Sequence, residues 1–289
     1  MNIQKELREA IGRRPLHADK NDFGRVFVLA GSRGMSGACY LTAMSCLRSG
    51  AGLVTVGIPK GLMHALGRRF TEAMILPLPE TRSGALSARA ASPIAEYLKG
   101  QNVIALGPGL SLNRETQTLV RHVVLRSKLP MVVDADALNA FRGKTKLLVH
   151  VRSNAILTPH AAEFLRLFGG KKPSGDLQRK KRAKEVSRTH GFVVVLKGHH
   201  TVVAAPDGAC YVNSTGNPGM ATGGSGDVLT GVIAAMLGQG VDPFRAACFG
   251  VYLHGLAGDL AAREKGETSL IAGDILNALP QAFQKVLGR

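Results

Sequence analysis

The chain of 289 residues contains no tryptophan, and aromatic residues make up only 5% of it. Proteins that hold single-stranded nucleic acid stack bases on aromatic side chains, so this composition argues against such a platform. Acidic residues are also few, with 20 Asp and Glu against 37 Lys and Arg, which gives a formal net charge of +17. Such a surplus favours polyanionic small molecules or nucleic acid as partners, or is simply a solvated basic surface. The basic residues are scattered, so we predict no nucleic-acid partner and place the one dense run, at 179–182, on the outer face of a helix.

Long apolar runs are missing as well. No stretch approaches the roughly 18 residues that a membrane span needs, and the first 14 residues mix basic and acidic side chains without an apolar signal segment. We therefore expect a soluble, cytoplasmic protein that has no membrane partner. The four cysteines show neither CxxC spacing nor a disulfide framework. They fit a reducing cytosol, as small core residues.

Short apolar runs recur along the chain, bounded by Gly, Pro or Asp. Runs that are apolar at every position are typical of parallel strands covered on both faces. They predict strands at 26–29, 53–58, 103–106, 131–133, 155–157 and 192–196. Between and after these runs, apolar side chains share one face of predicted helices at 41–47, 228–237 and 271–286. This alternation predicts an α/β fold, a three-layer αβα arrangement around a mostly parallel sheet.

Two further apolar runs, 201–204 and 209–212, are separated by the segment Pro206, Asp207 and Gly208. They predict an antiparallel hairpin at one edge of the sheet. In open parallel sheets a ligand binds beyond the carboxyl ends of the strands. The segments that directly follow the strands are therefore the candidates for function.

Glycine-containing segments follow the first and third predicted strands. The segment 30–38 has three glycines and precedes a helix, whose first amides attract anions. It matches neither a Walker A loop nor GxGxxG, so a plain strand-to-helix turn and a ligand loop both remain open. The segment 107–109 is either a tight turn before the helix that starts near Asn113, or a place where a ligand approaches the Gly109 backbone.

Two aspartates follow the strand at 131–133. Asp136 fits the N-cap of the next helix, because an Asp side chain accepts hydrogen bonds from helix-start amides. Asp134 lies at the carboxyl end of the strand and could reach a hydrated Mg²⁺, an ion usually held by one or two carboxylates plus waters and phosphates. No complete set of metal ligands follows from the sequence.

The strand at 155–157 is followed by Thr158, Pro159, His160 and, three residues later, Glu163. Thr158 as N-cap, Pro159 as the first helical residue and Glu163 in the first turn describe an ordinary helix start. His160 is left unexplained by this pattern. It is either structural, as most lone histidines are, or a ligand contact, since it lies at the ligand edge of the sheet.

Lys197, Gly198, His199, His200 and Thr201 join two predicted strands. Gly198 suits a hairpin turn that needs no function. The alternative is a turn whose amides, together with Lys197 and Thr201, contact a nucleotide.

The strongest pattern is the loop at 215–227. Five glycines occur in the eleven residues 216–226, and ordering them costs conformational entropy, so the exposed amides of this loop are expected to meet a ligand. Successive amides at a helix N-terminus form an anion hole, which the helix dipole strengthens. Asp227 is either a first-turn cap or a base, because a carboxylate beside phosphates can accept a hydroxyl proton. The helix-start electrostatics is expected to lower its pKa.

The Gly-Ser-Gly-Asp element at 224–227 resembles the ribokinase-like superfamily, in which this Asp is the base and the preceding amides form the anion hole. A longer ordered set resembles the ADP/ATP-dependent NAD(P)H-hydrate dehydratase family from about residue 15 to 287. The set comprises Ser36-Gly37-Ala38, Gly107-Pro108-Gly109, the segment 134–139, Thr158-Pro159-His160 with Glu163, Lys197-Gly198 with Thr201, and the segment 217–227. Each motif is weak alone, whereas the ordered set is specific.

The resemblance implies that the S-form of hydrated NADH or NADPH is dehydrated at the expense of ADP or ATP, with Mg²⁺ as cofactor. NAD(P)H is regenerated, and phosphate is released with AMP or ADP. The residues that would contact the hydrated dinucleotide are Ala38, Gly109, His160 and Asp227, with Asp227 as the base. Those that would contact the adenine nucleotide are Lys197, Gly198, His199, His200, Thr201 and Gly226. Two departures from the family pattern are Ser225 in place of the usual Thr, and two histidines where smaller residues are usual.

Some members of that family carry a fused epimerase domain ahead of the dehydratase. The first predicted strand begins here at residue 26, so we expect residues 1–289 to form a single domain and the epimerase to be a separate functional partner. The resemblance also implies a homo-oligomer. The alternative function is a kinase of the same superfamily, such as a hydroxymethylpyrimidine or thiazole kinase. A nucleotide sensor is disfavoured, because it has no need of a carboxylate that points at phosphates.

Overall fold

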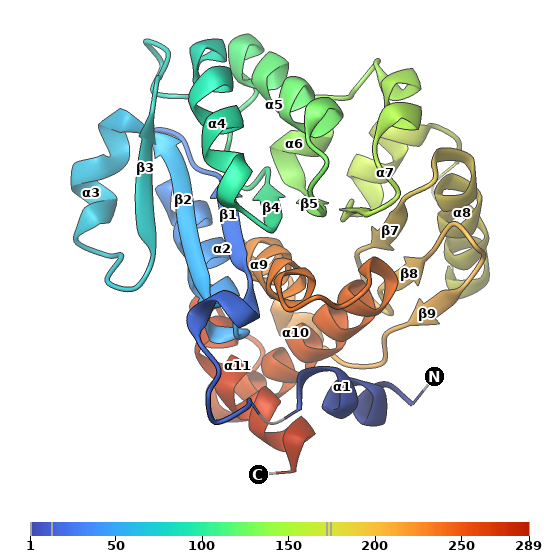
Figure 1. The fold of residues 1–289 in the computed structure, drawn as a ribbon. Helices are drawn as coiled ribbons and strands as arrows, with labels where there is room; N and C mark the ends of the chain where they lie inside the picture. The colour runs from blue at the N-terminus through green and yellow to red at the C-terminus, as the bar shows by residue number, and fades with distance from the viewer. Residues whose placement is uncertain (1, 13, 172, 174, 289) are drawn as a thin grey trace.

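The protein is described by a computed structural model that covers residues 2–12, 14–171, 173 and 175–288. Within these residues the strands form one sheet in the order β3-β2-β1-β4-β5-β6-β7-β8-β9 (Figure 1). Neighbours from β3 to β7 are parallel, and β8 and β9 are antiparallel. The strands are β1 (Arg25–Leu29), β2 (Leu53–Pro59), β3 (Met74–Leu78), β4 (Val103–Leu106), β5 (Met131–Val133), β6 (Ala155–Leu157), β7 (Val193–Leu196), β8 (Val202–Ala204) and β9 (Cys210–Val212).

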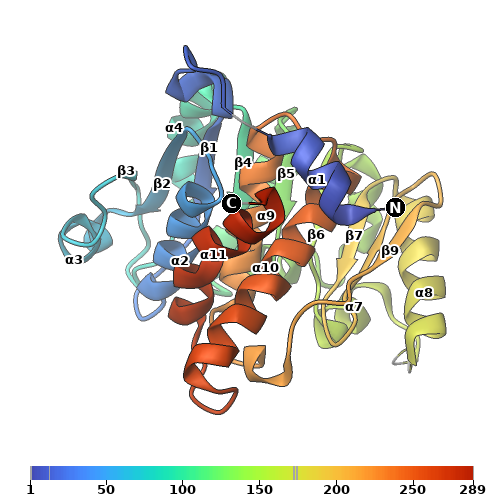
Figure 2. The same ribbon diagram turned by 90° about the horizontal axis from the view of Figure 1, so that it is seen from below.

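Helices cover both faces of the sheet, as the three-layer αβα prediction requires. On one side lie α4 (Ala91–Tyr97), α5 (Arg114–Arg126), α6 (Ala135–Asn139), α7 (Ala161–Phe168) and α8 (Gly175–His190). On the other lie α1 (Ile3–Ile11), α2 (Ser36–Arg48), α9 (Ser225–Gly238), α10 (Pro243–Lys265) and α11 (Ala272–Leu287). Figure 2, seen from below, shows α10 and α11 across the outside of this second layer. The short α3 (Met63–Gly67) precedes β3.

The side chains of β1 show why continuously apolar runs in the sequence correctly predicted the strands of this sheet. Val26 and Val28 belong to the core beneath α2, α9, α10 and α11, whereas Phe27 and Leu29 belong to the core on the opposite face. Successive strand side chains point to opposite faces, so a strand covered twice must be apolar throughout. The mostly parallel sheet and its antiparallel edge hairpin, β8–β9, are confirmed.

Strand β3 was missed by the sequence prediction. It lies at the edge of the sheet, where it pairs with β2, and it carries the exposed Pro77. Proline cannot donate a hydrogen bond to a strand ladder and is therefore tolerated at such edges. A proline in a run of only five residues also weakens the pattern that predicts a strand.

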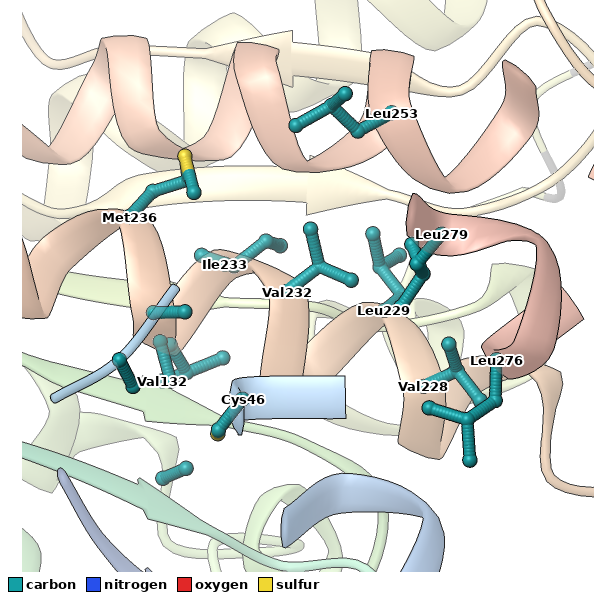
Figure 3. Close-up of a cluster of buried hydrophobic side chains, with 14 of the residues drawn as sticks. Cys46, Val132, Val228, Leu229, Val232, Ile233, Met236, Leu253, Leu276 and Leu279 are labelled. Carbon is teal, nitrogen blue, oxygen red and sulfur yellow. The ribbon is translucent and has the colours of Figure 1, made fainter. Parts of the chain in front are cut away.

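Helix α9 differs from the amphipathic helix that was predicted from residue 228 onward. All residues from Val228 to Leu237 are buried. Figure 3 shows the apolar side chains of this helix that it labels, Val228, Leu229, Val232, Ile233 and Met236, among those of α2, α10 and α11 and near Val132 of β5. A helix that is apolar on every side is a core helix. The helix that carries Asp227 at its start is therefore held rigidly on all sides.

Two smaller predictions change in detail. Ile271 is the N-cap of α11 and is 59% exposed, so it does not belong to the buried stripe of that helix. The basic run at 179–182 lies on α8, where Lys180 and Lys181 are exposed as predicted. Arg179 and Arg182 are instead half-buried, because their guanidinium groups bind backbone carbonyls of neighbouring turns.

Candidate active site

A cavity of about 870 Å³ opens beyond the carboxyl ends of β5, β6 and β7. Its size and mixed lining fit a cofactor-sized ligand. The order of the sheet explains its place, because in parallel strands all carboxyl ends meet at one edge. The wall is formed by residues that follow these strands, by the glycine-rich loop, by the first turns of α9, and by Val251, His254 and Gly255 of α10. The site residues predicted from the sequence that line it are His160, Lys197, Gly198, His199, His200, Thr201, Gly226 and Asp227.

Ala38 and Gly109 lie outside this lining but next to each other. A Cβ at position 109 would come within 3.0 Å of the Ala38 Cβ. The loops after β1 and β4 meet where the strand order reverses: the Gly31 amide donates to the Pro108 carbonyl, and the Ser32 hydroxyl donates to the Gly109 carbonyl at 2.8 Å. Such a reversal point is a common ligand site in open α/β sheets.

The glycine-rich loop is ordered by the protein itself. Asp259 of α10 accepts hydrogen bonds from the Gly216 amide at 2.9 Å and from the Asn217 side chain at 3.0 Å. The buried Asn213 donates to the carbonyls of Thr215 and Val251. The glycines of this loop are therefore ordered in part by side chains of the protein, and not by a ligand alone as the composition predicted.

Two backbone amides at the C-terminal end of this loop nevertheless remain available as hydrogen-bond donors. Within the described part of the chain, the amides of Gly226 and Asp227 have no hydrogen-bond acceptor. Gly224, at φ +90°, is the N-cap and offers no side chain to them. The first amides of a helix have no partner inside the helix and carry its positive end. Both amides belong to residues that line the cavity, so they suit an anion.

Asp227 does not cap α9, because the cap position belongs to Gly224. Its half-buried carboxyl faces the cavity. Burial and the nearby Asp134 carboxylate raise the pKa of Asp227 to about 7, although the Lys197 ammonium lowers it in part. The lowered pKa predicted from the helix start is wrong, because burial and the carboxylates around Asp227 outweigh the effect of the helix start. A pKa near 7 suits a general base at neutral pH.

Lys197 and Asp134 form a close ion pair under the first turn of α9. The Lys197 Nζ lies 2.6 Å from Asp134 Oδ1, and Thr230 donates to Asp134 Oδ2 at 2.8 Å. Burial lowers the pKa of Lys197, but the Asp134 and Glu163 carboxylates more than offset this, so the pKa is raised. Asp134 is 1% exposed and both its oxygens are engaged.

These contacts argue against Asp134 as a magnesium ligand. Among the described residues, no group of three or more His, Cys, Asp or Glu side chains could hold a metal ion. An ion that arrives with nucleotide phosphates needs no such group.

Asp136 and the start of α7 differ from their predicted roles. Asp136 lies inside α6 and accepts a hydrogen bond from the Ser111 amide at 2.9 Å, so it is not an N-cap. The N-cap of α7 is His160, two residues later than the predicted Thr158. The His160 Nδ1 accepts from the amides of Ala162 and Glu163. The His160 Nε2 lies 3.6 Å from a Glu163 carboxylate oxygen, and His160 lines the cavity.

Hydrogen bonds from a side chain of α8 hold the turn between β7 and β8. Arg179 donates to the carbonyls of Leu196, His199 and His200. His200 adopts φ +53° and its Nδ1 lies 2.8 Å from an Asp176 carboxylate oxygen. The rings of His199 and His200 stack with centroids 3.8 Å apart. The two histidines that depart from the family pattern thus form one exposed stack at the cavity mouth.

Several residues of the site were missed by the sequence analysis. His254 of α10 is buried, its Nε2 lies 2.9 Å from the Ser225 carbonyl, and burial lowers its pKa to about 4. Asp259, Thr230 and Arg179 likewise act through contacts with segments far along the chain. Only the register of the fold brings these pairs together. No local pattern identifies them.

The fold and site define an α/β protein of the ribokinase-like class. A ribokinase-like superfamily protein from Enterococcus faecalis superposes with a TM-score of 0.84 at 29% identity, covering 99% of this chain and 95% of that one. The predicted ribokinase-like fold is thereby confirmed.

Within that class, the family model of NAD(P)H-hydrate dehydratase matches residues 26–281. A bifunctional NAD(P)H-hydrate repair enzyme of Moorella thermoacetica is 46% identical over 279 residues, which are 96% of this chain and 53% of the relative. The chain thus spans about half the length of that relative. The structure of an ADP/ATP-dependent NAD(P)H-hydrate dehydratase from Bacillus subtilis, co-crystallised with ATP/Mg²⁺, has a TM-score of 0.82 at 30% identity and covers 98% and 97% of the two chains. The chain belongs to the NAD(P)H-hydrate dehydratase family.

No helix in the described residues is long and apolar enough to cross a membrane.

Proposed function

We propose that this protein dehydrates the S-form of hydrated NADH or NADPH at the expense of ADP or ATP. NAD(P)H is regenerated, and phosphate leaves with AMP or ADP. One observation carries the proposal: a carboxyl with a pKa near 7, that of Asp227, shares a large cavity with the free amides of Gly226 and Asp227. Membership of the family and likeness to the Bacillus subtilis enzyme support the choice of substrates.

In the proposed reaction, the Asp227 carboxylate accepts the proton of the hydroxyl on the hydrated ring. That oxygen attacks the terminal phosphorus of the nucleotide, and the bond from this phosphorus to the bridging oxygen breaks. The free amides at the start of α9 stabilise the negative charge on the transferring group. Phosphate then leaves the ring with its carbon–oxygen bond electrons, a neighbouring ring carbon loses a proton, and the double bond returns.

The two ligands would take different parts of the site. We assign the hydrated dinucleotide to Ala38, Gly109, His160 and Asp227, and the adenine nucleotide to the turn from Gly198 to Thr201 with Gly226. Lys197, which the resemblance also places at the nucleotide, is already paired with Asp134. Mg²⁺ would accompany the nucleotide phosphates, where it neutralises charge during phosphoryl transfer. The Bacillus subtilis enzyme crystallised with ATP/Mg²⁺ supports this pairing of ion and nucleotide.

A substitution in the β7–β8 turn tests which of the two ligands this turn contacts. Thr201 both accepts from the Gly198 amide and donates to the Gly198 carbonyl. Loss of a neutral hydrogen bond costs about 0.5–1.5 kcal/mol, so Thr201→Ala should raise the KM for ADP or ATP about three- to tenfold, with little change for the hydrated dinucleotide. Steady-state kinetics with each substrate varied in turn checks this. The opposite ranking would mean that the two ligand assignments are exchanged.

The pH dependence follows from the raised pKa of Asp227. The carboxyl must be ionised to act as a base, so kcat/KM should fall about tenfold for each pH unit below 7 and level off above it. A profile measured between pH 5 and pH 9 checks this. A flat profile through pH 7 would show that no group with this pKa limits the reaction.

A small-molecule kinase of the same superfamily remains the alternative, since it would use a base at the same position. The two functions differ in the fate of the phosphoryl group. Incubation with hydrated NADH and ADP should release free phosphate and AMP in equal amounts, as measured by a phosphate assay and chromatography. A phosphorylated dinucleotide that accumulates without NADH would instead identify a kinase.

Several predictions stay predictions. These are the single domain at 1–289, the separate epimerase as functional partner, the homo-oligomer and the cytoplasmic location.

A further inference from the structure

The ion pair of Lys197 and Asp134 is attached to the same helix surface that carries Asp227. Asp134 Oδ2 accepts from the Thr230 hydroxyl, and positions 227 and 230 lie on one face of α9 because they are three residues apart. The Lys197 side chain is 17% exposed and that of Asp134 is 1% exposed. The pair is thus a fixed part of the wall beneath the base. It is not a mobile surface contact.

The Lys197 ammonium also lies close to Gly226, in the turn that bears the free amides. A Cβ at position 226 would lie 3.3 Å from the Lys197 Nζ and 3.7 Å from Asp134 Oδ2. The glycine therefore leaves room for the ion pair to approach the helix start. The Asp134 carboxylate lies 2.6 Å from the Lys197 ammonium and already pairs with its charge. Lys197 is therefore not a free cation that is available to bind phosphate.

The charged groups that face Asp227 come from several elements. Carboxylates lie after β5, at Asp134, and on α6, at Asp136, and both raise the pKa of Asp227. The α7 carboxylate Glu163 acts on Lys197, and His254 of α10 is uncharged at neutral pH because burial lowers its pKa. His160, at the start of α7, lines the same cavity. Lys197 is the cation that offsets the two aspartates at Asp227.

We propose that Lys197 is a positioning residue for Asp227: held by Asp134 and Thr230, its ammonium supports the turn at Gly226 and supplies the positive charge that lets Asp227 ionise, and it does not bind nucleotide phosphate directly. The proposal rests on the proposed function, in which Asp227 is the base. It goes beyond the resemblance, which assigned Lys197 to the nucleotide.

Two opposite substitutions test the electrostatic part. Lys197→Met removes the cation and should raise the titration midpoint of Asp227 by about one pH unit or more, whereas Asp134→Asn removes a carboxylate and should lower it by a similar amount. The midpoint is read from the carboxyl carbon of Asp227 by NMR, assigned with Asp227→Asn. The acid limb of kcat/KM should move in the same directions.

The double variant Lys197→Met/Asp134→Asn provides the matched control. It removes both charges and buries no unpaired ion, so its midpoint should lie near that of the wild type. If Lys197→Met alone fails to fold, Asp134→Asn is compared with the double variant, because these two proteins differ only at position 197. The titration midpoint of Asp227 should be higher in the double variant than in Asp134→Asn.

Calorimetry with ADP distinguishes a positioning role of Lys197 from direct binding of phosphate by Lys197. The Kd for ADP should change less than about tenfold in the double variant, since a direct charged contact with phosphate is worth more than that. A midpoint that stays fixed while the Kd for ADP rises about tenfold or more would overturn the proposal, as would both single variants moving the midpoint in the same direction. The NMR titration needs no turnover, so it can fail or succeed independently of the dehydratase activity.

Discussion

Asp227→Asn should lower kcat by about 100-fold or more, because the isosteric amide keeps the shape of the side chain but cannot accept the proton of the substrate hydroxyl. The Kd for ADP should stay close to that of the wild type, since the amides at the start of α9 remain in place. Single-turnover kinetics together with calorimetry measures both quantities. A variant that keeps more than about a tenth of the wild-type kcat would end the assignment of Asp227 as the base.

The same substitution has a second expected result, in stability. The folded-state pKa of Asp227, about 7, lies above its ordinary value of 3.8, so the ionised carboxylate opposes folding increasingly as the pH rises between these values. Asparagine carries no charge. The Tm of Asp227→Asn should therefore equal or exceed that of the wild type at pH 8, and the difference should narrow as the pH falls toward 5.

Asp274 offers a matched control for this experiment. It also lies in the first turn of a helix, α11, where its carboxylate accepts from the Ile271 amide. It does not line the cavity. Asp274→Asn should lower the Tm slightly and leave kcat unchanged, because a helix-start carboxylate contributes about 0.3–1 kcal/mol to stability.

The second large effect is expected at Gly226. Gly226→Val should raise the Kd for ADP or ATP about ten- to a hundredfold, because a branched side chain would press on the Lys197 and Asp134 pair and obstruct the free amides, and a hydrogen bond to a charged group is worth about 1.5–3 kcal/mol. Calorimetric titration with nucleotide measures this. Wild-type affinity in the variant would mean that these amides are not the anion hole.

Gly223→Val is the control at a neighbouring glycine of the same loop. A Cβ at position 223 would have no atom within 4 Å, and residue 223 does not line the cavity. Its effect on the Kd for nucleotide should be small. Similar losses in both variants would point to general disturbance of the loop.

The sequence allowed the fold and the order of the site motifs to be predicted, because both depend on local patterns. Strands covered on two faces are apolar throughout, and the segments after them fall at one edge of the sheet. The limits of this approach show at β3, where one exposed proline hid an edge strand, and at α7, where the cap lies at His160 and not at Thr158.

The electrostatics of the site could not be read from local patterns. Asp134 and Lys197 are separated by 63 positions, and Asp259 holds a loop 43 positions before it. The local pattern around Asp227 contains only the helix start, which by itself predicts a lowered pKa. The folded arrangement adds burial and two more carboxylates, which reverse the direction.

The central claim is that the cavity regenerates a nicotinamide cofactor from its hydrate at the expense of an adenine nucleotide. The most direct measurement is the near-ultraviolet absorbance of dihydronicotinamide after purified protein, Mg²⁺ and ADP or ATP are added to S-hydrated NADH. The account requires absorbance to return only when nucleotide is present, with one phosphate released for each NADH formed, and not to return with Asp227→Asn. If the wild-type protein binds nucleotide but no absorbance returns with either ADP or ATP, for hydrated NADH and hydrated NADPH alike, the proposed dehydration is contradicted.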